Sequence, residues 1–383
     1  MPTHYDVLGV ERTATVDTVR KAYRKLARRH HPDVSQDPKS HDMMARINEA
    51  FATLVDPDTR LEYDAQLNGA PVVDEVKPSR KPVVIKLRAR LKAHRTPVYA
   101  LGYVKQTSRL VSGSFDNEVI FWEGEEAIRS RTKLESGAVS VIQPIDDETV
   151  VASGAVENTV AAWRVHQGRV ESWRNTSEEW VCCVALSPDG TMLASGSLHK
   201  TLVVVDTTTG KVVFTHKKHK GAVTAVAFSP DGKIVASGSA DCTVKLWAAK
   251  SGKLLATLNA IRSQVTALAF SGDGVFLAVA AVDLSIRVFN LKTGVLEKMM
   301  FGHEKPIEAL AFHPNGWLFA SAGRDGAVKL WNADKGLGQL HIAASHMPMT
   351  SLAFSPDGTT LAAGSLDKTI RLWSLSVRDE AHG

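Results

Sequence analysis

The feature that most constrains this fold is a unit of about 42 residues that occurs seven times in succession. Each copy ends in an aromatic residue or valine, and the spacing is 41 residues once and 42 residues five times, at Trp122, Trp163, Val205, Trp247, Phe289, Trp331 and Trp373. Short alternating runs are separated by Pro-Asp-Gly and Asp-x-Thr turns, as in residues 223–247, which is the pattern of β-hairpins. Because one such unit cannot bury its own apolar face, the copies must pack on one another.

These units resemble the repeats of WD-repeat propellers, in which a period of roughly 40 to 45 residues builds one four-stranded blade. The resemblance implies an all-β, seven-bladed propeller over residues 83–376, with a C-terminal tail over 377–383. Only ten residues follow Trp373, so the last unit lacks an outer strand. We expect residues 83–92 to supply that strand and close the ring. Its expected buried face is Ile85, Leu87, Ala89 and Leu91, and its solvated face is Lys86, Arg88, Arg90 and Lys92.

Residues 1–69 have helical rather than strand periodicity. One apolar stripe is Val16, Val19, Tyr23 and Leu26, and a second is Met43, Met44, Ile47, Ala50, Phe51, Leu54 and Val55. Thr15 and Asp17 provide helix-start chemistry before the first stripe, and Pro32 prevents that helix from continuing. The pattern predicts a small all-α domain, an antiparallel helix pair with short flanking helices near residues 5–8 and 58–67. A linker over residues 70–82 separates it from the repeats.

The strongest short motif is His31-Pro32-Asp33, which follows the first long helix. With Tyr5-Asp-Val-Leu-Gly before it and Ile47-Asn-Glu-Ala-Phe after it, residues 3–69 resemble a J domain, the DnaJ-like module of cochaperones. The resemblance implies binding to a DnaK-type (heat shock protein 70) ATPase and stimulation of its ATP hydrolysis. Asp33 would then pair with an arginine of that partner, and His31 would order the motif. A cationic helix face that attracts an acidic partner comprises Arg20, Lys21, Arg24, Lys25, Arg28 and Arg29.

A set of four polar residue types recurs at the same offsets in three repeats: His94, Ser112, Asp116, Trp122; His219, Ser237, Asp241, Trp247; and His303, Ser321, Asp325, Trp331. Ser, His and Asp together invite a hydrolase interpretation. A catalytic centre is needed once, however, whereas a structural device is needed in every blade. In WD repeats these residues form a buried hydrogen-bond chain, so we interpret them as structural tetrads. Repeats with Glu157, His199 or Asp283 at the acidic position lack one or more members.

Composition and absent motifs narrow the function classes. The net charge is +5, and the chain has neither an apolar run of about 18 residues nor a secretory signal, which predicts no membrane association. Three cysteines are too few and too poorly spaced for a disulfide framework or zinc site, which favours the cytoplasm. No phosphate-binding loop or nucleophile elbow is present, so we expect no enzyme activity, no cofactor and no metal.

Some residues carry an open alternative. The basic residues 76–95 are interpreted as a solvated strand face rather than a nucleic-acid site. Cys182 and Cys183 are expected to be packed thiols. Trp173 and Trp180 fall outside the repeat pattern and could anchor a partner, although core or edge packing is favoured.

The favoured function is an adaptor cochaperone whose propeller binds a protein client or complex while the J domain recruits the ATPase. No Gly/Phe-rich segment and no Cys-x-x-Cys-x-Gly region follows the J domain, so substrate specificity is assigned to the propeller. The alternatives are a scaffold that uses the J domain for docking alone and, more weakly, a nucleic-acid-associated adaptor. The sequence does not name the client, the chaperone paralogue or the oligomeric state.

Overall fold

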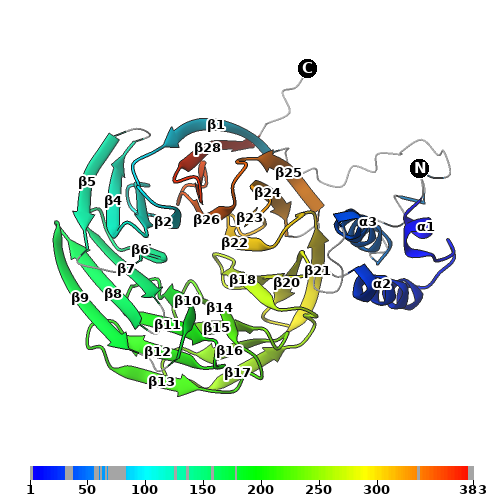
Figure 1. The fold of residues 1–383 in the computed structure, drawn as a ribbon, viewed down its shortest axis with the longest axis horizontal. Helices are drawn as coiled ribbons and strands as arrows, with labels where there is room; N and C mark the ends of the chain where they lie inside the picture. Colours follow the sequence, from blue (N-terminus) through cyan, green and yellow to red (C-terminus); the bar gives the residue numbers. More distant parts are fainter. Residues whose placement is uncertain are drawn as a thin grey trace. The chain divides into compact units, whose positions relative to one another are not determined.

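The structure is a computed structural model that describes residues 3–30, 38–55, 60, 63–64, 67, 83–124, 127–134, 138–156, 159–176, 179–333 and 337–377. The chain divides near residue 82 into a helical unit and a β unit (Figure 1). The linker expected over residues 70–82 lies outside the described residues. In the described ranges, no helix is long and apolar enough to cross a membrane.

The helical unit contains α1 (His4–Leu8), α2 (Val16–His30) and α3 (Pro38–Val55). Thr3 caps α1, and the Thr15 hydroxyl accepts a hydrogen bond from the Thr18 backbone N–H at 3.3 Å at the start of α2. The apolar stripes meet in one core formed by Tyr5, Leu8, Val19, Tyr23, Met44, Ile47, Ala50, Phe51 and Leu54. The predicted helix pair is therefore confirmed.

Two details of the helical prediction need comment. Met43 was assigned to the buried stripe, but its side chain is 38% exposed, because Met44 and Ile47 already define the face that meets α2. That assignment was wrong. Of the flanking helix expected over residues 58–67, the structure describes Arg60, Tyr63, Asp64 and Leu67, all in helical conformation. Its remaining residues lie outside the described part.

In the β unit, the described strands form seven four-stranded antiparallel sheets arranged around a centre (Figure 1). Blades 1 to 3 contain β2 (Val98–Tyr103), β3 (Leu110–Ser114), β4 (Glu118–Glu123) and β5 (Ala127–Lys133); β6 (Val141–Pro144), β7 (Thr149–Val156), β8 (Thr159–His166) and β9 (Arg169–Thr176); and β10 (Val181–Leu186), β11 (Met192–Ser197), β12 (Leu202–Asp206) and β13 (Val212–His216). Blades 4 and 5 contain β14 (Val223–Phe228), β15 (Ile234–Ser239), β16 (Val244–Ala248) and β17 (Leu254–Leu258); and β18 (Val265–Phe270), β19 (Phe276–Ala281), β20 (Ser285–Asn290) and β21 (Val295–Phe301).

Blade 6 contains β22 (Ile307–Phe312), β23 (Leu318–Gly323), β24 (Ala327–Asn332) and β25 (Leu337–Ala343), and blade 7 contains β26 (Met349–Phe354), β27 (Thr360–Ser365), β28 (Ile370–Val377) and β1 (Val83–Leu91). The seven-bladed propeller expected from the repeats is confirmed. Its last strand ends at Val377, one residue beyond the expected boundary.

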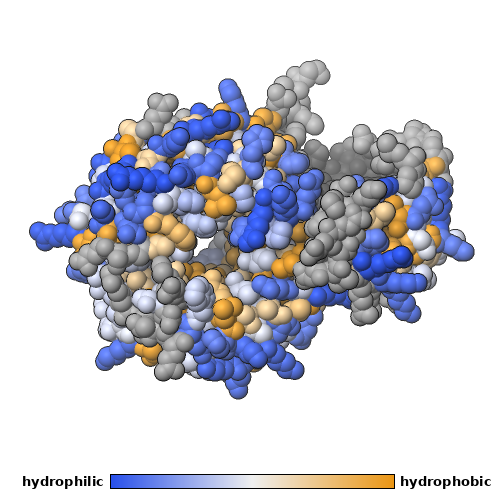
Figure 2. Space-filling view, in the orientation of Figure 1, coloured by the Kyte–Doolittle hydropathy of each residue, from blue (hydrophilic) through white to orange (hydrophobic). Residues whose placement is uncertain are grey.

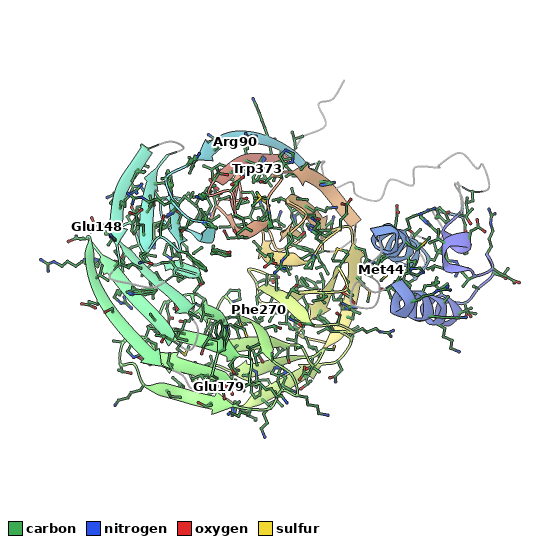
Figure 3. All side chains as sticks on the ribbon, viewed as in Figure 1. Met44, Arg90, Glu148, Glu179, Phe270 and Trp373 are labelled. Atoms are coloured by element: carbon green, nitrogen blue, oxygen red, sulfur yellow. The ribbon has the colours of Figure 1, made fainter. Side chains whose placement is uncertain are left out.

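Blade 7 joins the two ends of the repeat array. β1 pairs antiparallel with β28, from Val83 opposite Val377 to Leu91 opposite Ile370. Figure 3 labels Arg90 on β1 and Trp373 on β28 of this sheet. The N-terminal strand therefore supplies the outer edge of the last blade, as the alternation in residues 83–92 predicts.

The inner and outer faces of β1 differ from the prediction at one residue. The register shifts between Leu87 and Ala89, which is the signature of a β-bulge. Val83 and Leu91 are buried, whereas Leu87 is 40% exposed. Leu87 was predicted on the buried face, and this was wrong because a bulge interrupts the two-residue alternation of side chains.

Two recurrent sequence phrases have clear structural roles. In the Ser-Pro-Asp-Gly turn of blade 4, the Ser229 hydroxyl donates to Asp231 Oδ1 at 2.6 Å and accepts from the Ile234 N–H at 2.9 Å. Gly232 completes the turn with a φ of 68°, a value that favours glycine. In the Ser-Gly-Ser strand, a Cβ on Gly238 would lie 2.4 Å from Val265 of blade 5, so glycine permits adjacent blades to pack closely.

The innermost strand of each blade lines a central channel, which opens at the centre of the β unit in Figure 2. Its volume is about 290 Å³, and its lining includes Tyr99, Thr224, Thr266, Glu308 and Thr350.

Candidate functional site

The first candidate site is the cationic face of α2. Lys21, Lys25 and Arg29 recur every four residues, which places them on one side of the helix, and all three side chains are exposed. Val19 and Tyr23 point to the core instead. The side chains of the other predicted members, Arg20, Arg24 and Arg28, lie outside the described residues, as do His31, Pro32 and Asp33 themselves. In sequence the motif falls between the end of α2 and the start of α3.

The position of α2 is supported by a residue that the sequence analysis did not single out. The Arg60 guanidinium donates to the Ala14 carbonyl at 2.6 Å and to the Arg12 carbonyl at 2.7 Å, and its Nε donates to the Tyr5 hydroxyl at 3.0 Å. The Tyr5 hydroxyl in turn donates to Asp64 at 2.7 Å. Arg60 thereby connects the segment before α2 to α1. Its only sequence signal is a lone arginine in a charged stretch, which is too weak to identify this role.

The second candidate site is the polar tetrad of blade 1. The His94 Nδ1 lies 3.1 Å from Asp116 Oδ2, and its Nε2 lies 2.8 Å from Ser112 Oγ. The Trp122 indole N–H donates to the same Ser112 Oγ at 2.9 Å. The four side chains therefore form one continuous chain from the turn between β3 and β4 to the blade interior.

The arrangement recurs in full in blade 4 and in part in blade 6. In blade 4, His219 lies 3.0 Å from Asp241 and 2.8 Å from Ser237, and Trp247 donates to Ser237 at 2.8 Å. In blade 6, Trp331 donates to Ser321 at 2.7 Å. His303 of that blade is buried, and Asp325 Oδ1 accepts from the Ala327 N–H at 3.0 Å.

The tetrads have the chemistry of a structural network. Both ring nitrogens of His94 and His219 have partners, and burial lowers the pKa of each imidazole despite the neighbouring aspartate. His94, Asp116 and Glu118 offer possible metal-ligand atoms within 4.8 Å of one another. These atoms are already engaged, because Glu118 also pairs with Arg131 at 2.7 Å. The geometry favours buried hydrogen bonding over hydrolysis or metal binding.

Blade 5 replaces the tetrad by apolar packing. Ile261, Val279 and Phe289 occupy the positions of His, Ser and Trp, and all three are buried. The remaining acid, Asp283, forms an ion pair of 2.8 Å with Arg287, whose side chain is fully buried. In this blade the acidic turn residue is therefore paired with an arginine instead of the tetrad histidine.

Blades 2 and 3 depart further from the tetrad. In blade 2, Ser153 donates to the Ala161 carbonyl at 2.8 Å, and within the described residues the buried Trp163 Nε1 finds no acceptor. Glu157 lies outside the described residues. In blade 3, Val205 replaces the tryptophan and His199 is exposed. Ser195 occupies the position of the tetrad serine, whereas Ser197, two residues further on, donates to Glu179 at 2.5 Å.

The four residues with open alternatives have different surroundings. Trp173 is half-buried against Gly210, in agreement with edge packing. Trp180 is 53% exposed, so the favoured packing was wrong for this residue.

Cys183 Sγ lies 3.5 Å from the Val223 carbonyl, and burial raises the pKa of its thiol. Cys182 was expected to be packed but is exposed, because the register of β10 shifts between Val181 and Cys183 and leaves Cys182 at the irregularity.

Comparison with known families agrees with this architecture. The model of the WD domain, G-beta repeat, matches more than half of the chain, in residues 85–123, 170–206, 210–248, 252–290, 294–332 and 338–374. The DnaJ domain model matches residues 3–64. This chain is a WD-repeat protein with an N-terminal DnaJ domain. The WD-repeat matches omit the unit that ends at Trp163, although β6 to β9 form a complete blade there.

Relatives of the WD-repeat protein's DnaJ domain are bacterial chaperones. The chain is 48% identical over 67 residues to the "Chaperone protein DnaJ" of Dictyoglomus thermophilum, which is 17% of each chain. It is 52% identical over 61 residues to that of Halalkalibacterium halodurans, 16% of each chain. A "Chaperone protein DnaJ 1" of Aquifex aeolicus is 48% identical over 65 residues, 17% of this chain and 18% of the relative. The chain thus matches about a sixth of the length of these relatives.

Proposed function

We propose that this protein is a cochaperone that binds a DnaK-type (heat shock protein 70) ATPase and stimulates its ATP hydrolysis. The observation that carries the proposal is a DnaJ domain in which His31-Pro32-Asp33 directly follows a helix with exposed Lys21, Lys25 and Arg29. A cationic surface increases the rate of encounter with an acidic partner, and a proline-stiffened motif lowers the entropy cost of docking.

The propeller, in this proposal, binds a protein client or complex and the DnaJ domain brings the ATPase to it. Joining two binding modules in one chain raises the effective concentration of one partner near the other. The chain itself is proposed to have no enzyme activity, because the His-Ser-Asp sets serve as hydrogen-bond networks. The cytoplasm is the proposed compartment, since Cys182, Cys183 and Cys242 are all free thiols.

The direct test is single-turnover ATP hydrolysis by a DnaK-type chaperone in the presence of the full chain. Asp33→Asn removes the negative charge proposed to pair with the ATPase, so stimulation is expected to fall on the order of tenfold or more. Glu11→Gln removes an exposed carboxylate of the same domain and is the matched control. Full stimulation by Asp33→Asn would overturn the assignment.

The cationic face has its own test. Reversal of Lys21 and Lys25 to glutamate is expected to weaken binding to the ATPase and to reduce the dependence of association rate on salt. Arg46 is exposed on α3, and Arg46→Glu should have a smaller effect on ATPase binding and on the salt dependence of the association rate. Stable capture of a complex without ATPase stimulation by the unaltered chain would instead favour a scaffold that uses the DnaJ domain for docking alone.

A further inference from the structure

Blade 3 carries an exposed apolar pair, one residue in the segment that joins it to blade 2 and one in the turn between β11 and β12. Trp180, just before β10, and Leu198, just after β11, are each 53% exposed. The Leu198 N–H donates to the Trp180 carbonyl at 2.9 Å, so the two residues are direct neighbours although 18 positions separate them. Blade 3 therefore exposes two large apolar side chains on backbone segments that are joined by a hydrogen bond.

The same backbone bond occurs in the next blade with small side chains. There the Ala240 N–H donates to the Ala222 carbonyl at 2.9 Å. The bond is thus a property of the fold, since it also joins Val282 to Gln264 in blade 5 and Leu366 to Pro348 in blade 7, at 2.9 and 3.0 Å. Blade 3 differs because both partners are large, apolar and more than half exposed. The backbone hydrogen bond of Trp180 forms with any side chain at this position, so the fold does not require the exposed indole. Large exposed apolar side chains that the fold does not require are typical of binding surfaces.

Exposed lysines lie in the turn of Leu198 and in the segment that reaches Glu179. Lys200 lies in the turn that carries Leu198, and Lys217, Lys218 and Lys220 precede β14 in the adjacent blade; all four side chains are exposed. Lys217 Nζ lies 2.7 Å from Glu179 Oε1, which brings the lysine-rich segment next to Trp180. We name the set Trp180, Leu198, Lys200, Lys217, Lys218 and Lys220 the Trp180 patch.

The acid that the structure describes next to Trp180, Glu179, is already paired. Although burial acts in the opposite direction, hydrogen bonds from Lys217 and Ser197 hold the pKa of Glu179 at about 2. Ser197 Oγ donates to its second oxygen at 2.5 Å, and the Glu179 side chain, labelled in Figure 3, is 16% exposed. Among the described residues, the charge that the patch presents to a partner is therefore that of Lys200, Lys218 and Lys220.

We propose that the Trp180 patch binds an acidic peptide segment that carries an apolar side chain. The apolar side chain would lie on Trp180 and Leu198, and carboxylates on either side would pair with the lysines. The proposal deepens the proposed function, on which it rests, because it gives the chemistry of a partner of the propeller. Nucleic-acid platforms stack successive bases on several aromatic rings, whereas here the neighbour of the tryptophan is a leucine, so a peptide is favoured.

The test begins with selection of random 12-residue peptides displayed on phage against the immobilised full chain. Enriched peptides are expected to contain Asp or Glu around an aromatic or aliphatic residue. Their dissociation constants are then measured by fluorescence anisotropy at low and high salt, for the unaltered chain, Trp180→Ala and the double variant Lys218→Glu, Lys220→Glu. Each change is expected to weaken binding about tenfold, and salt should weaken binding to the unaltered chain.

Matched controls separate this site from general effects. Phe115→Ala removes another exposed aromatic side chain, in the turn after β3, and the double variant Lys250→Glu, Lys253→Glu reverses an exposed lysine pair in the turn before β17. Both should bind the selected peptides as the unaltered chain does. Unchanged thermal unfolding midpoints would show that the variants are folded.

Three results would overturn the inference: no acidic-apolar enrichment, peptide binding that survives both patch variants, or tighter binding of a labelled single-stranded oligonucleotide than of the peptides. ATPase stimulation by Trp180→Ala, without peptide present, is expected to equal that of the unaltered chain. Loss of peptide binding and loss of chaperone stimulation are therefore distinguishable, because Asp33→Asn should affect only the latter.

Discussion

The Trp247 indole N–H donates to Ser237 Oγ at 2.8 Å, and the same oxygen lies 2.8 Å from His219 Nε2. Ser237→Ala would leave two buried nitrogens without this partner, so it should reduce the free energy of unfolding by about 1–3 kcal/mol. Ser251→Ala, an exposed serine of the same blade, should cost less than about 0.5 kcal/mol. Urea unfolding followed by tryptophan fluorescence measures both, and equal costs would contradict the network.

Blade 5 suggests a second prediction about the tetrad of blade 4. It already carries Ile261, Val279 and Phe289 at the tetrad positions. Replacing His219, Ser237 and Trp247 together by Ile, Val and Phe should cost less than the sum of the three single replacements, because no buried polar group is left unpaired. A non-additivity of about 1 kcal/mol or more is expected in urea titrations of the four variants. Strict additivity would argue against coupling.

The buried histidines predict acid sensitivity in a defined range. Burial lowers the pKa of His94 and His219 below the ordinary value of 6.5, so the unfolded chain takes up protons that the folded chain does not. Stability should therefore be lost as the pH falls below about 6.5, by at most about 1.4 kcal/mol per pH unit for each histidine. The carboxylates act at lower pH, since the pKa of Asp241 is about 2 despite its burial, owing to hydrogen bonds from Thr243 and Lys220.

Urea midpoints at pH 7.5, 6.5 and 5.5 measure this effect. The midpoint should change little between the first two values and should fall between the last two. A replacement that removes a titrating imidazole, such as His219→Gln, should flatten this part of the profile even if it lowers stability overall. A midpoint independent of pH down to 5.5 would show that the buried imidazoles do not titrate differently on unfolding.

Closure of the ring predicts different costs for two leucines on one strand. Leu91 is 3% exposed, whereas Leu87, at the bulge of β1, is 40% exposed. Leu91→Ala should reduce the free energy of unfolding by about 2–4 kcal/mol, and Leu87→Ala by less than about 1 kcal/mol. Thermal and urea unfolding of the two variants test this difference. Equal costs would mean that β1 does not pack in blade 7 as described.

Left-handed residues in the turns predict a stabilising change. Lys368 has a φ of 70° and an exposed side chain, and the equivalent residue of blade 6 is Gly326. Glycine relieves roughly 1–2 kcal/mol of backbone strain but costs about 0.5–1 kcal/mol in unfolded-chain entropy. Lys368→Gly should therefore stabilise the propeller by about 0.5 kcal/mol. Lys250→Gly, in an exposed turn without a positive φ, should destabilise it. Thermal unfolding midpoints measure both changes, and a higher midpoint for Lys250→Gly than for Lys368→Gly would contradict this prediction.

The sequence by itself determined the architecture, because the relevant signals are local and repeated. Seven copies of one strand pattern predict seven blades, the alternation in residues 83–92 predicts the closing strand, and constant offsets predict which residues form each tetrad. The two apolar stripes likewise predict the helix pair. The blades, the tetrads and the helix pair follow from local spacing, since periodicity states which side chains share a face. The closing strand also follows from the lack of an outer strand after Trp373.

Only the tertiary structure decided which of these residues are covered and by what. The exposure of Leu87 depends on a bulge against β28, and the apolar pair depends on a backbone bond between Trp180 and Leu198 in different turns. Arg60 acts through carbonyls 46 and 48 positions away. These relationships arise from packing between segments far apart in sequence, and local periodicity does not identify such partners. A repeat pattern therefore predicts the blade but not which side chains remain exposed on its surface.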